Sequence, residues 1–177
     1  MNKTQKGCLK IFILFIIVFT SLIIWLIWYQ HQKEKQAKID SIKQYKICNN
    51  SELIAEQHKI NFYSFNTAEI EKINFYLIRK NKIIKDTTIE PNSIDFDFPF
   101  RGFKKTDTIV VKTKSNLFFR IFGFHYEPNL HYGMFGYLGH SDCRFTCDVN
   151  GSTTETTISV YKDDAIEMNI LPNKASH

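Results

Sequence analysis

The sequence predicts a mainly β domain that is preceded by one membrane-spanning helix and a short helical stalk. One observation is a run of uncharged, largely apolar residues at 11–29, and another is an alternation of apolar and polar residues from Lys59 onward. Alternation with a period of two is typical of half-buried strands. Strand spacings of about 8–12 residues favour an antiparallel two-sheet β-sandwich, with an Ig-like arrangement or a small barrel as alternatives. The predicted segments are a basic N-terminal tail at 1–10, a transmembrane signal anchor at 11–29, a juxtamembrane stalk at 30–50 and a β-sandwich domain at 51–177.

The predicted anchor is the segment IFILFIIVFTSLIIWLIWY, which contains no charged residue. As a helix, a segment of this length rises about 28 Å, which matches a hydrocarbon core of about 30 Å. Trp25, Trp28 and Tyr29 lie at one end of the segment, where aromatic rings favour the headgroup layer. We expect these three side chains, together with Ile11 and Phe15, to contact the lipid bilayer.

Two signals compete over the orientation of this anchor. The stalk carries five lysines and the N-terminal tail three, which favours a cytoplasmic domain if lysines alone are counted. A short basic tail ahead of an apolar run, however, is how a signal anchor with a cytoplasmic N-terminus begins. We favour the second interpretation, which places the domain on the periplasmic or cell-surface side. A site for signal peptidase is absent, so we expect an uncleaved anchor, with a cleaved signal peptide as the alternative.

The net charge of +5 does not belong to the predicted domain. Residues 1–29 contribute +3 and residues 30–50 a further +3, whereas residues 51–177 hold 15 basic and 16 acidic side chains. A nucleic-acid-binding domain carries its basic residues on the folded surface, so we expect no nucleic-acid partner. The flanking lysines are better suited to contacts with anionic headgroups.

Residue composition predicts the stalk, and turn residues mark the ends of the predicted strands. Residues 30–46 lack Gly and Pro and are rich in helix-forming residues, which predicts a helix. Turn residues at Asn81-Lys82 and Asn150-Gly151 separate predicted strands. The predicted strands are 59–65, 72–79, 82–90, 94–98, 107–113, 117–125 and 143–149, with a final hairpin over 155–171.

Residues 123–140 differ in composition from the rest of the chain. They hold four of the seven glycines, three of the six histidines and many aromatic residues. This composition predicts a long loop or an irregular hairpin, and long loops often carry binding surfaces. Its aromatic rings could stack on a ligand, or they could instead fold back over an open end of the core. We expect the binding residues to be Tyr126, His131, Tyr132, Phe135 and Tyr137.

Possible metal ligands are also concentrated in this region, at His125, His131, His140, Asp142, Cys143, Cys147 and Asp148. Their spacing matches no zinc signature, so we expect no metal site and no other cofactor. Two cysteines four residues apart on one strand lie about 13 Å apart, which is too far for a disulfide. Either Cys143 or Cys147 could therefore pair with Cys48 in an oxidising compartment, or both could be buried free thiols.

Catalytic signatures are absent from the sequence: it contains no nucleophile elbow, phosphate loop or dinucleotide-binding motif. The function that these observations favour is a membrane-anchored, non-enzymatic β-sandwich that binds a protein or an envelope component. One alternative is an anchored hydrolase or metal-dependent enzyme that uses the His/Cys-rich segment 125–148. Another alternative is a structural subunit of a membrane complex.

Overall fold

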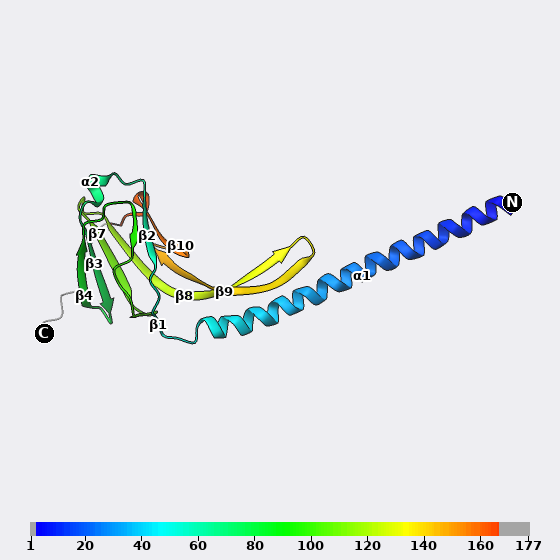
Figure 1. Ribbon diagram of the computed structural model, residues 1–177, viewed down its shortest axis with the longest axis horizontal. Coiled ribbons are helices and arrows are strands. Elements are labelled where there is room, and N and C mark those ends of the chain that lie inside the picture. The colour runs from blue at the N-terminus through cyan, green and yellow to red at the C-terminus, as the bar shows by residue number, and fades with distance from the viewer. Residues whose placement is uncertain (1–2, 167–177) are drawn as a thin grey trace. The chain divides into compact units, whose positions relative to one another are not determined.

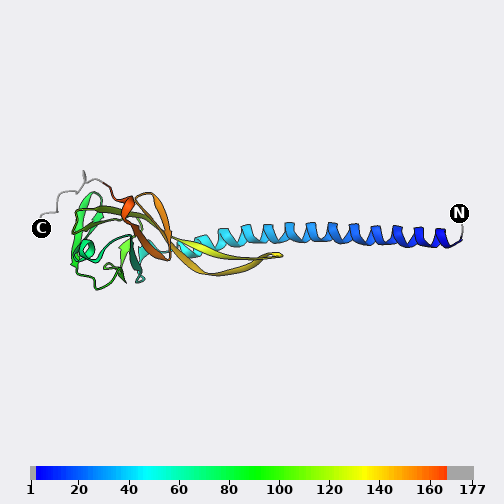
Figure 2. The same cartoon turned by 90° about the horizontal axis from the view of Figure 1, so that it is seen from above.

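The computed structural model describes residues 3–166, and the protein is mainly β with one long N-terminal helix. The chain forms two compact units. The first, here called the helix–hairpin unit, comprises Met1–Lys43 and Asn129–Ser141. The second, here called the β unit, comprises Gln44–Pro128 and Asp142–His177. Figures 1 and 2 show the elements of both units.

Helix α1 (Lys3–Cys48) runs without a break through the predicted anchor and the predicted stalk. Its sequence has no proline, and its only glycine lies near the N-terminus, so nothing interrupts the hydrogen-bond ladder. The hydroxyl groups of Thr20 and Ser21 donate hydrogen bonds to carbonyl groups of the preceding turn. Among the described residues, α1 is the one helix long and apolar enough to cross a membrane.

The apolar side chains of α1 are exposed over the predicted anchor, including Phe15, Trp25 and Trp28. None of the most apolar stretch of the helix is buried by other parts of the described chain. A soluble protein rarely leaves so large an apolar surface uncovered. The side chain of Ile11 lies outside the described side chains.

The β unit is built mainly on a six-stranded sheet with the order β10-β9-β8-β7-β3-β4. A three-stranded sheet has the order β11-β2-β5, and β1 pairs with β6. The bounds of the strands are β1 Leu53–Ile54, β2 Lys59–Tyr63, β3 Ile73–Arg79, β4 Lys82–Ile89, β5 Asp95–Asp97, β6 Phe103–Lys104, β7 Thr108–Thr113, β8 Phe118–Gly133, β9 Gly136–Val149, β10 Ser152–Glu155 and β11 Thr157–Tyr161. Two short helices complete the described elements, α2 Thr67–Ile70 and η1 Lys162–Asp164.

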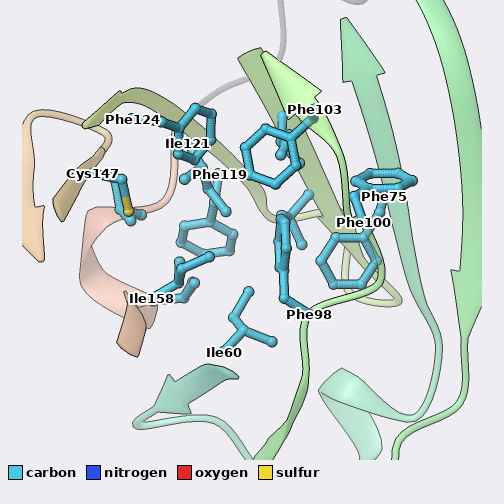
Figure 3. Packing of buried hydrophobic residues seen from close by; sticks show 14 of the residues in the cluster. Ile60, Phe75, Phe98, Phe100, Phe103, Phe119, Ile121, Phe124, Cys147 and Ile158 are labelled. Atoms are coloured by element: carbon cyan, nitrogen blue, oxygen red, sulfur yellow. The ribbon is translucent and has the colours of Figure 1, made fainter. Parts of the chain in front are cut away.

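The core of the β unit is dominated by phenylalanine rings (Figure 3). Strands of both larger sheets contribute buried side chains, such as Ile60 and Ile158 from the three-stranded sheet and Phe75 from the six-stranded sheet. The segment between β5 and β6 adds Phe98 and Phe100. These two rings and Phe75 meet edge to face, which is a favoured geometry for aromatic pairs.

Most of the predicted strands are present with nearly the predicted bounds, including those at 72–79, 82–90 and 107–113. The predicted turn at Asn150-Gly151 is confirmed, and both residues have positive φ. The first turn lies one residue earlier than predicted, because Lys80 and Asn81 are the residues with positive φ. Both turns suit the right-handed twist of a hairpin.

The predicted hairpin over 155–171 is wrong for the residues that the structure describes. β11 ends at Tyr161 and is followed by the 3₁₀ turn η1 and an isolated bridge between Ile166 and Phe118. Residues 167–171 lie outside the described residues. β11 pairs with β2 in parallel, whereas the predicted sheets were wholly antiparallel. The packing of the sheets determines which distant strands pair. The alternation of apolar and polar residues identifies a strand and its buried face, but not its partner.

Candidate binding surface

The segment at 123–140 is a regular extension of two strands and not a loop. β8 continues to Gly133, β9 begins at Gly136, and these neighbouring strands form a hairpin. Met134 and Phe135 form its two-residue connection, and Gly136 has a φ of 93°, which glycine adopts without strain. Of the four glycines that suggested a loop, Gly133 and Gly136 flank the turn at the tip, whereas Gly123 and Gly139 lie within β8 and β9 and have positive φ. Of the two predicted forms, the hairpin is present and the long loop is not.

Within the helix–hairpin unit, the hairpin packs directly on α1. The Tyr137 hydroxyl donates a hydrogen bond of 2.9 Å to Oδ2 of Asp40, and the Tyr137 side chain is only 4% exposed. Desolvation and the hydrogen bond to Asp40 raise the pKa of Tyr137 to about 12, so the phenol stays protonated and keeps donating. Ala37 is also buried. Its side chain is small, so the hairpin can pack close to the helix at this position and cover it.

A second close approach lies at Gly136. A Cβ atom added there would lie 3.6 Å from Cβ of Lys33, which is ordinary van der Waals contact. The backbone at the tip therefore passes beside Lys33. Figures 1 and 2 both show the hairpin alongside α1, with its tip directed toward the N-terminal end of the helix.

A hollow of about 420 Å³ lies between α1 and the hairpin, inside the helix–hairpin unit. The helix and the hairpin each supply one wall, with charged, small and apolar side chains among the lining. The lining residues are Glu34, Ala37, Lys38, Ser41, Ile42, Leu130 and Tyr132. The hollow therefore combines apolar contact area with one acidic and one basic group.

The predicted binding residues divide into two groups. Tyr132 and Phe135 are 63% and 70% exposed, and His131 is also exposed. Tyr137 is buried against α1. Tyr126 belongs to the β unit, where its ring packs against Phe145 in the core. The hairpin thus presents His131, Tyr132 and Phe135 to solvent, and it does not present the other two.

Several residues that sequence reasoning did not single out belong to this surface. Met134 and Leu138 are apolar and strongly exposed at the tip. Ile42 lines the hollow from the helix side. A sequence signal for Met134 was present, because an apolar residue in a two-residue turn has no core to enter. The contribution of α1 carried no signal, since it depends on a contact between distant segments.

The cysteines are arranged as one disulfide and one buried thiol. Cys48 and Cys143 are joined across a sequence separation of 95, which selects the pairing that the sequence left open. Cys143 and Cys147 do not bridge each other, as predicted from their spacing on one strand. Cys147 is buried and free, and desolvation raises the pKa of its thiol to about 12.

Asn49 reinforces the disulfide at the end of α1. Its side-chain oxygen accepts hydrogen bonds from the backbone N–H of Tyr126 and from Nζ of Lys105, and its Nδ2 donates to the Tyr126 carbonyl. Cys48, Asn49, Lys105 and Tyr126 all belong to the β unit. The last turn of α1 is therefore held by one covalent bond and three side-chain hydrogen bonds. We expect this end of the helix to resist fraying.

The candidate metal ligands do not converge. In the part of the chain that the structure describes, no group of three or more His, Cys, Asp and Glu side chains is placed to hold a metal ion. The ring nitrogens of His125 lie 2.7 Å from the Gly123 carbonyl and 3.1 Å from a Glu127 carboxylate oxygen. Cys143 is held in the disulfide, so its sulfur is not free to act as a ligand.

His58 is a buried titratable group beside Tyr126. Its ring stacks on Phe145 with 3.7 Å between centroids, and Nε2 has no hydrogen-bond partner among the described residues. Desolvation lowers the pKa of His58, and the charge of Glu56 opposes this effect only in part. The imidazole is therefore neutral in the folded protein at neutral pH.

We expect His58 to make the β unit less stable at pH 5 than at pH 7. The unfolded state binds a proton at a pKa of about 6.5, whereas the folded state binds it only at a lower pH. The contribution of the neutral His58 imidazole to the free energy of unfolding is therefore fully present above about pH 6.5. It is lost as the pH falls toward the pKa of His58 in the folded protein. Each pKa unit of difference is worth about 1.4 kcal/mol. Urea unfolding at both pH values measures the loss, and His58→Phe should reduce it. An unchanged pH dependence in the variant would assign the effect to other groups.

Comparison with protein-family models, curated proteins and solved structures finds no match to this chain. The features of the molecule that bear on function are the apolar helix, the disulfide, the hairpin packed on α1 and the hollow between the hairpin and α1.

Proposed function

We propose that the protein is a non-enzymatic, membrane-anchored β-sandwich that binds a protein partner through the hollow between α1 and the β8–β9 hairpin. The observation that carries the proposal is the hollow itself, which places exposed Tyr132 opposite exposed Ile42. Binding energy at protein interfaces concentrates in a few such side chains, with tyrosine enriched among them.

The composition of the hollow suits a peptide segment better than a small molecule. Leu130, Tyr132 and Ile42 offer apolar contact, while Glu34 and Lys38 supply opposite charges on the same wall. An apolar patch with polar groups at its edge is the usual anatomy of an interface. The partner that fits is a protein segment with an apolar side chain flanked by polar groups, presented close to the membrane.

The sandwich arrangement is supported by the way in which the two larger sheets share one core. Side chains from β2 and β11 lie in the same buried cluster as those from β3, β7 and β8. The two sheets keep separate edges, at β4 and β10 in one and at β5 and β11 in the other. Separate edges favour a sandwich over a closed barrel.

The disulfide bears on the orientation of the anchor. Structural disulfides persist in oxidising compartments and are rare in the cytosol. The Cys48–Cys143 bond therefore supports an extracytoplasmic β unit and a cytoplasmic N-terminus. The count of lysines favoured the reverse, but the two flanks differ by only two lysines.

The two alternative functions are affected differently by these observations. A cysteine hydrolase built on the His/Cys-rich segment 125–148 would need a reactive thiol, but Cys143 is in a disulfide and Cys147 is buried with a raised pKa. Nucleophilic cysteines have exposed thiols with lowered pKa values. A structural subunit of a membrane complex would hold its partner permanently. Recovery of the partner in stoichiometric amounts with the purified protein would indicate this alternative.

We expect Tyr132→Ala and Ile42→Ala each to lower recovery of the partner by about tenfold or more. Full-length protein is crosslinked in its native membrane and purified, and the recovered partner is quantified by mass spectrometry. Both side chains are more than half exposed, so the variants should keep the circular dichroism of the parent. Ile84→Ala is the matched control, because Ile84 is an exposed isoleucine on the edge strand β4. Partner recovery that is unchanged in both hollow variants would contradict the proposed site.

A further inference from the structure

The tip of the β8–β9 hairpin is an exposed apolar surface without charged side chains. Met134, Phe135 and Leu138 are 88%, 70% and 70% exposed. No Asp, Glu, Lys or Arg occurs anywhere in the hairpin segment Asn129–Ser141. Exposed apolar clusters of this kind mark sites of contact with proteins or membranes.

The position of the tip along α1 selects between these two kinds of contact. Gly136 passes beside Lys33, and the hairpin points toward the N-terminal end of α1 (Figures 1 and 2). The apolar run of the helix ends at Tyr29. Lys33 follows Tyr29 by four positions in the helix, which is a rise of about 6 Å.

This distance is similar to the thickness of a headgroup layer. A bilayer of about 40–45 Å with a hydrocarbon core of about 30 Å has headgroup layers of about 5–8 Å. If Tyr29 marks the edge of the hydrocarbon core, Gly136 lies within the headgroup layer. Met134 and Phe135 form the turn at the tip, which points toward the N-terminal end of α1, so in this position their side chains would extend toward the hydrocarbon core.

The helix supplies the charges that such a position requires. Lys33, Lys35 and Lys38 lie in the turns that follow Tyr29, and Nζ of Lys33 lies 5.4 Å from the Tyr29 ring centroid. Basic groups within about 10 Å of the bilayer surface attract anionic lipid headgroups. An uncharged apolar tip beside a basic helix segment therefore suits the membrane interface, where apolar side chains contact acyl chains and lysines contact anionic headgroups.

We propose that the exposed apolar side chains at the hairpin tip, Met134, Phe135 and Leu138, enter the interfacial layer of the same bilayer that α1 crosses. The inference rests on the membrane anchor of the proposed function and adds a second point of attachment. The occupant of the exposed apolar surface is thus lipid. Two attachments fix the rotation of the helix–hairpin unit about the helix axis, and they hold the hollow just outside the membrane surface.

The test places an environment-sensitive nitrobenzoxadiazole label at the tip of the full-length protein. The label is attached through Phe135→Cys in a Cys8→Ser background, and Ile84→Cys provides the matched control on β4. The disulfide and the buried Cys147 remain as they are. Each protein is reconstituted into phosphatidylcholine–phosphatidylglycerol vesicles with and without lipids that carry a headgroup nitroxide.

At position 135 we expect blue-shifted emission and strong quenching by the nitroxide lipids, and at position 84 we expect neither. Adding Met134→Glu should move the emission at position 135 toward its value in water. Equal emission and equal quenching at both positions would overturn the inference. Shielding at position 135 in native membranes but not in pure lipid vesicles would also overturn it, in favour of a protein occupant.

Alkaline carbonate extraction of the same vesicles separates this inference from the anchor. Protein that stays with the membrane while the label at position 135 reports water would overturn tip insertion and leave the anchor in place. Release of the protein into the supernatant would overturn the anchor, and tip insertion with it. Retention together with a shielded label supports both.

Discussion

Replacing Cys143 by serine is expected to lower the free energy of unfolding by about 2–5 kcal/mol. The bond between Cys48 and Cys143 closes a long loop, with a sequence separation of 95. A crosslink that closes a loop of about 100 residues is worth up to about 4.7 kcal/mol through the entropy of the unfolded chain. The bond also joins the last turn of α1 to β9, beside Asn49, which makes its backbone hydrogen bonds with Tyr126 of β8. We therefore expect the variant to weaken these contacts as well.

Urea unfolding of the full-length protein in detergent, with and without dithiothreitol, measures this effect. The reductant should destabilise the parent protein and leave Cys143→Ser unchanged. Cys147→Ala is the control, because it removes the buried free thiol and keeps the disulfide. That control should remain sensitive to reductant. A parent protein with the same unfolding midpoint in both conditions would contradict the assigned role of the disulfide.

Replacing Phe98 by alanine is expected to cost about 3–5 kcal/mol of stability. Phe98 is 1% exposed. Its ring lies 5.8 Å from the Phe75 centroid, 6.0 Å from Phe100 and 6.1 Å from Phe103. Alanine would leave a cavity among three rings, which are themselves held by further ring contacts such as Phe75–Phe100 and Phe103–Phe124, so the core could collapse only in part. A loss of this size is a large share of the total stability of a typical domain.

Phe135→Ala is the matched control, since it makes the same substitution at an exposed site. Phe135 is 70% exposed, and surface substitutions usually change stability by less than about 0.5 kcal/mol. Thermal or urea unfolding in detergent compares the two variants with the parent. Similar losses at both positions would contradict the burial that the structure assigns to Phe98.

Local patterns in the sequence were sufficient for much of the fold. The apolar run to Tyr29 and the glycine-free, proline-free segment after it were predicted as an anchor helix and a helical stalk, because helix formation depends on residues within a few turns; the structure joins them in one helix. Strands such as 72–79 and 107–113 were predicted within one or two residues, since a half-buried strand repeats its pattern every two residues. The turn at Asn150-Gly151 followed from residues that adopt positive φ with little strain.

The candidate site was predicted only in part, because burial of a side chain depends on which segments meet. Tyr126 and Tyr132 occur in the same aromatic segment, yet one ring packs in the core and the other is exposed. Nothing in their immediate neighbours distinguishes them, since the difference arises where β8 leaves the β unit. Tyr137 was expected to be a binding residue, but it is buried and donates a hydrogen bond to Asp40, which is distant in sequence.

Pairings between distant segments could not be read from local patterns. Parallel pairing of β2 with β11, the choice of Cys143 over Cys147 as the partner of Cys48, and the hollow on α1 are of this kind. Each joins segments widely separated in the chain, and each requires the rest of the core to bring them together. Period and turn chemistry act over a few residues, whereas these contacts are selected by the packing of whole sheets and of a hairpin against a helix.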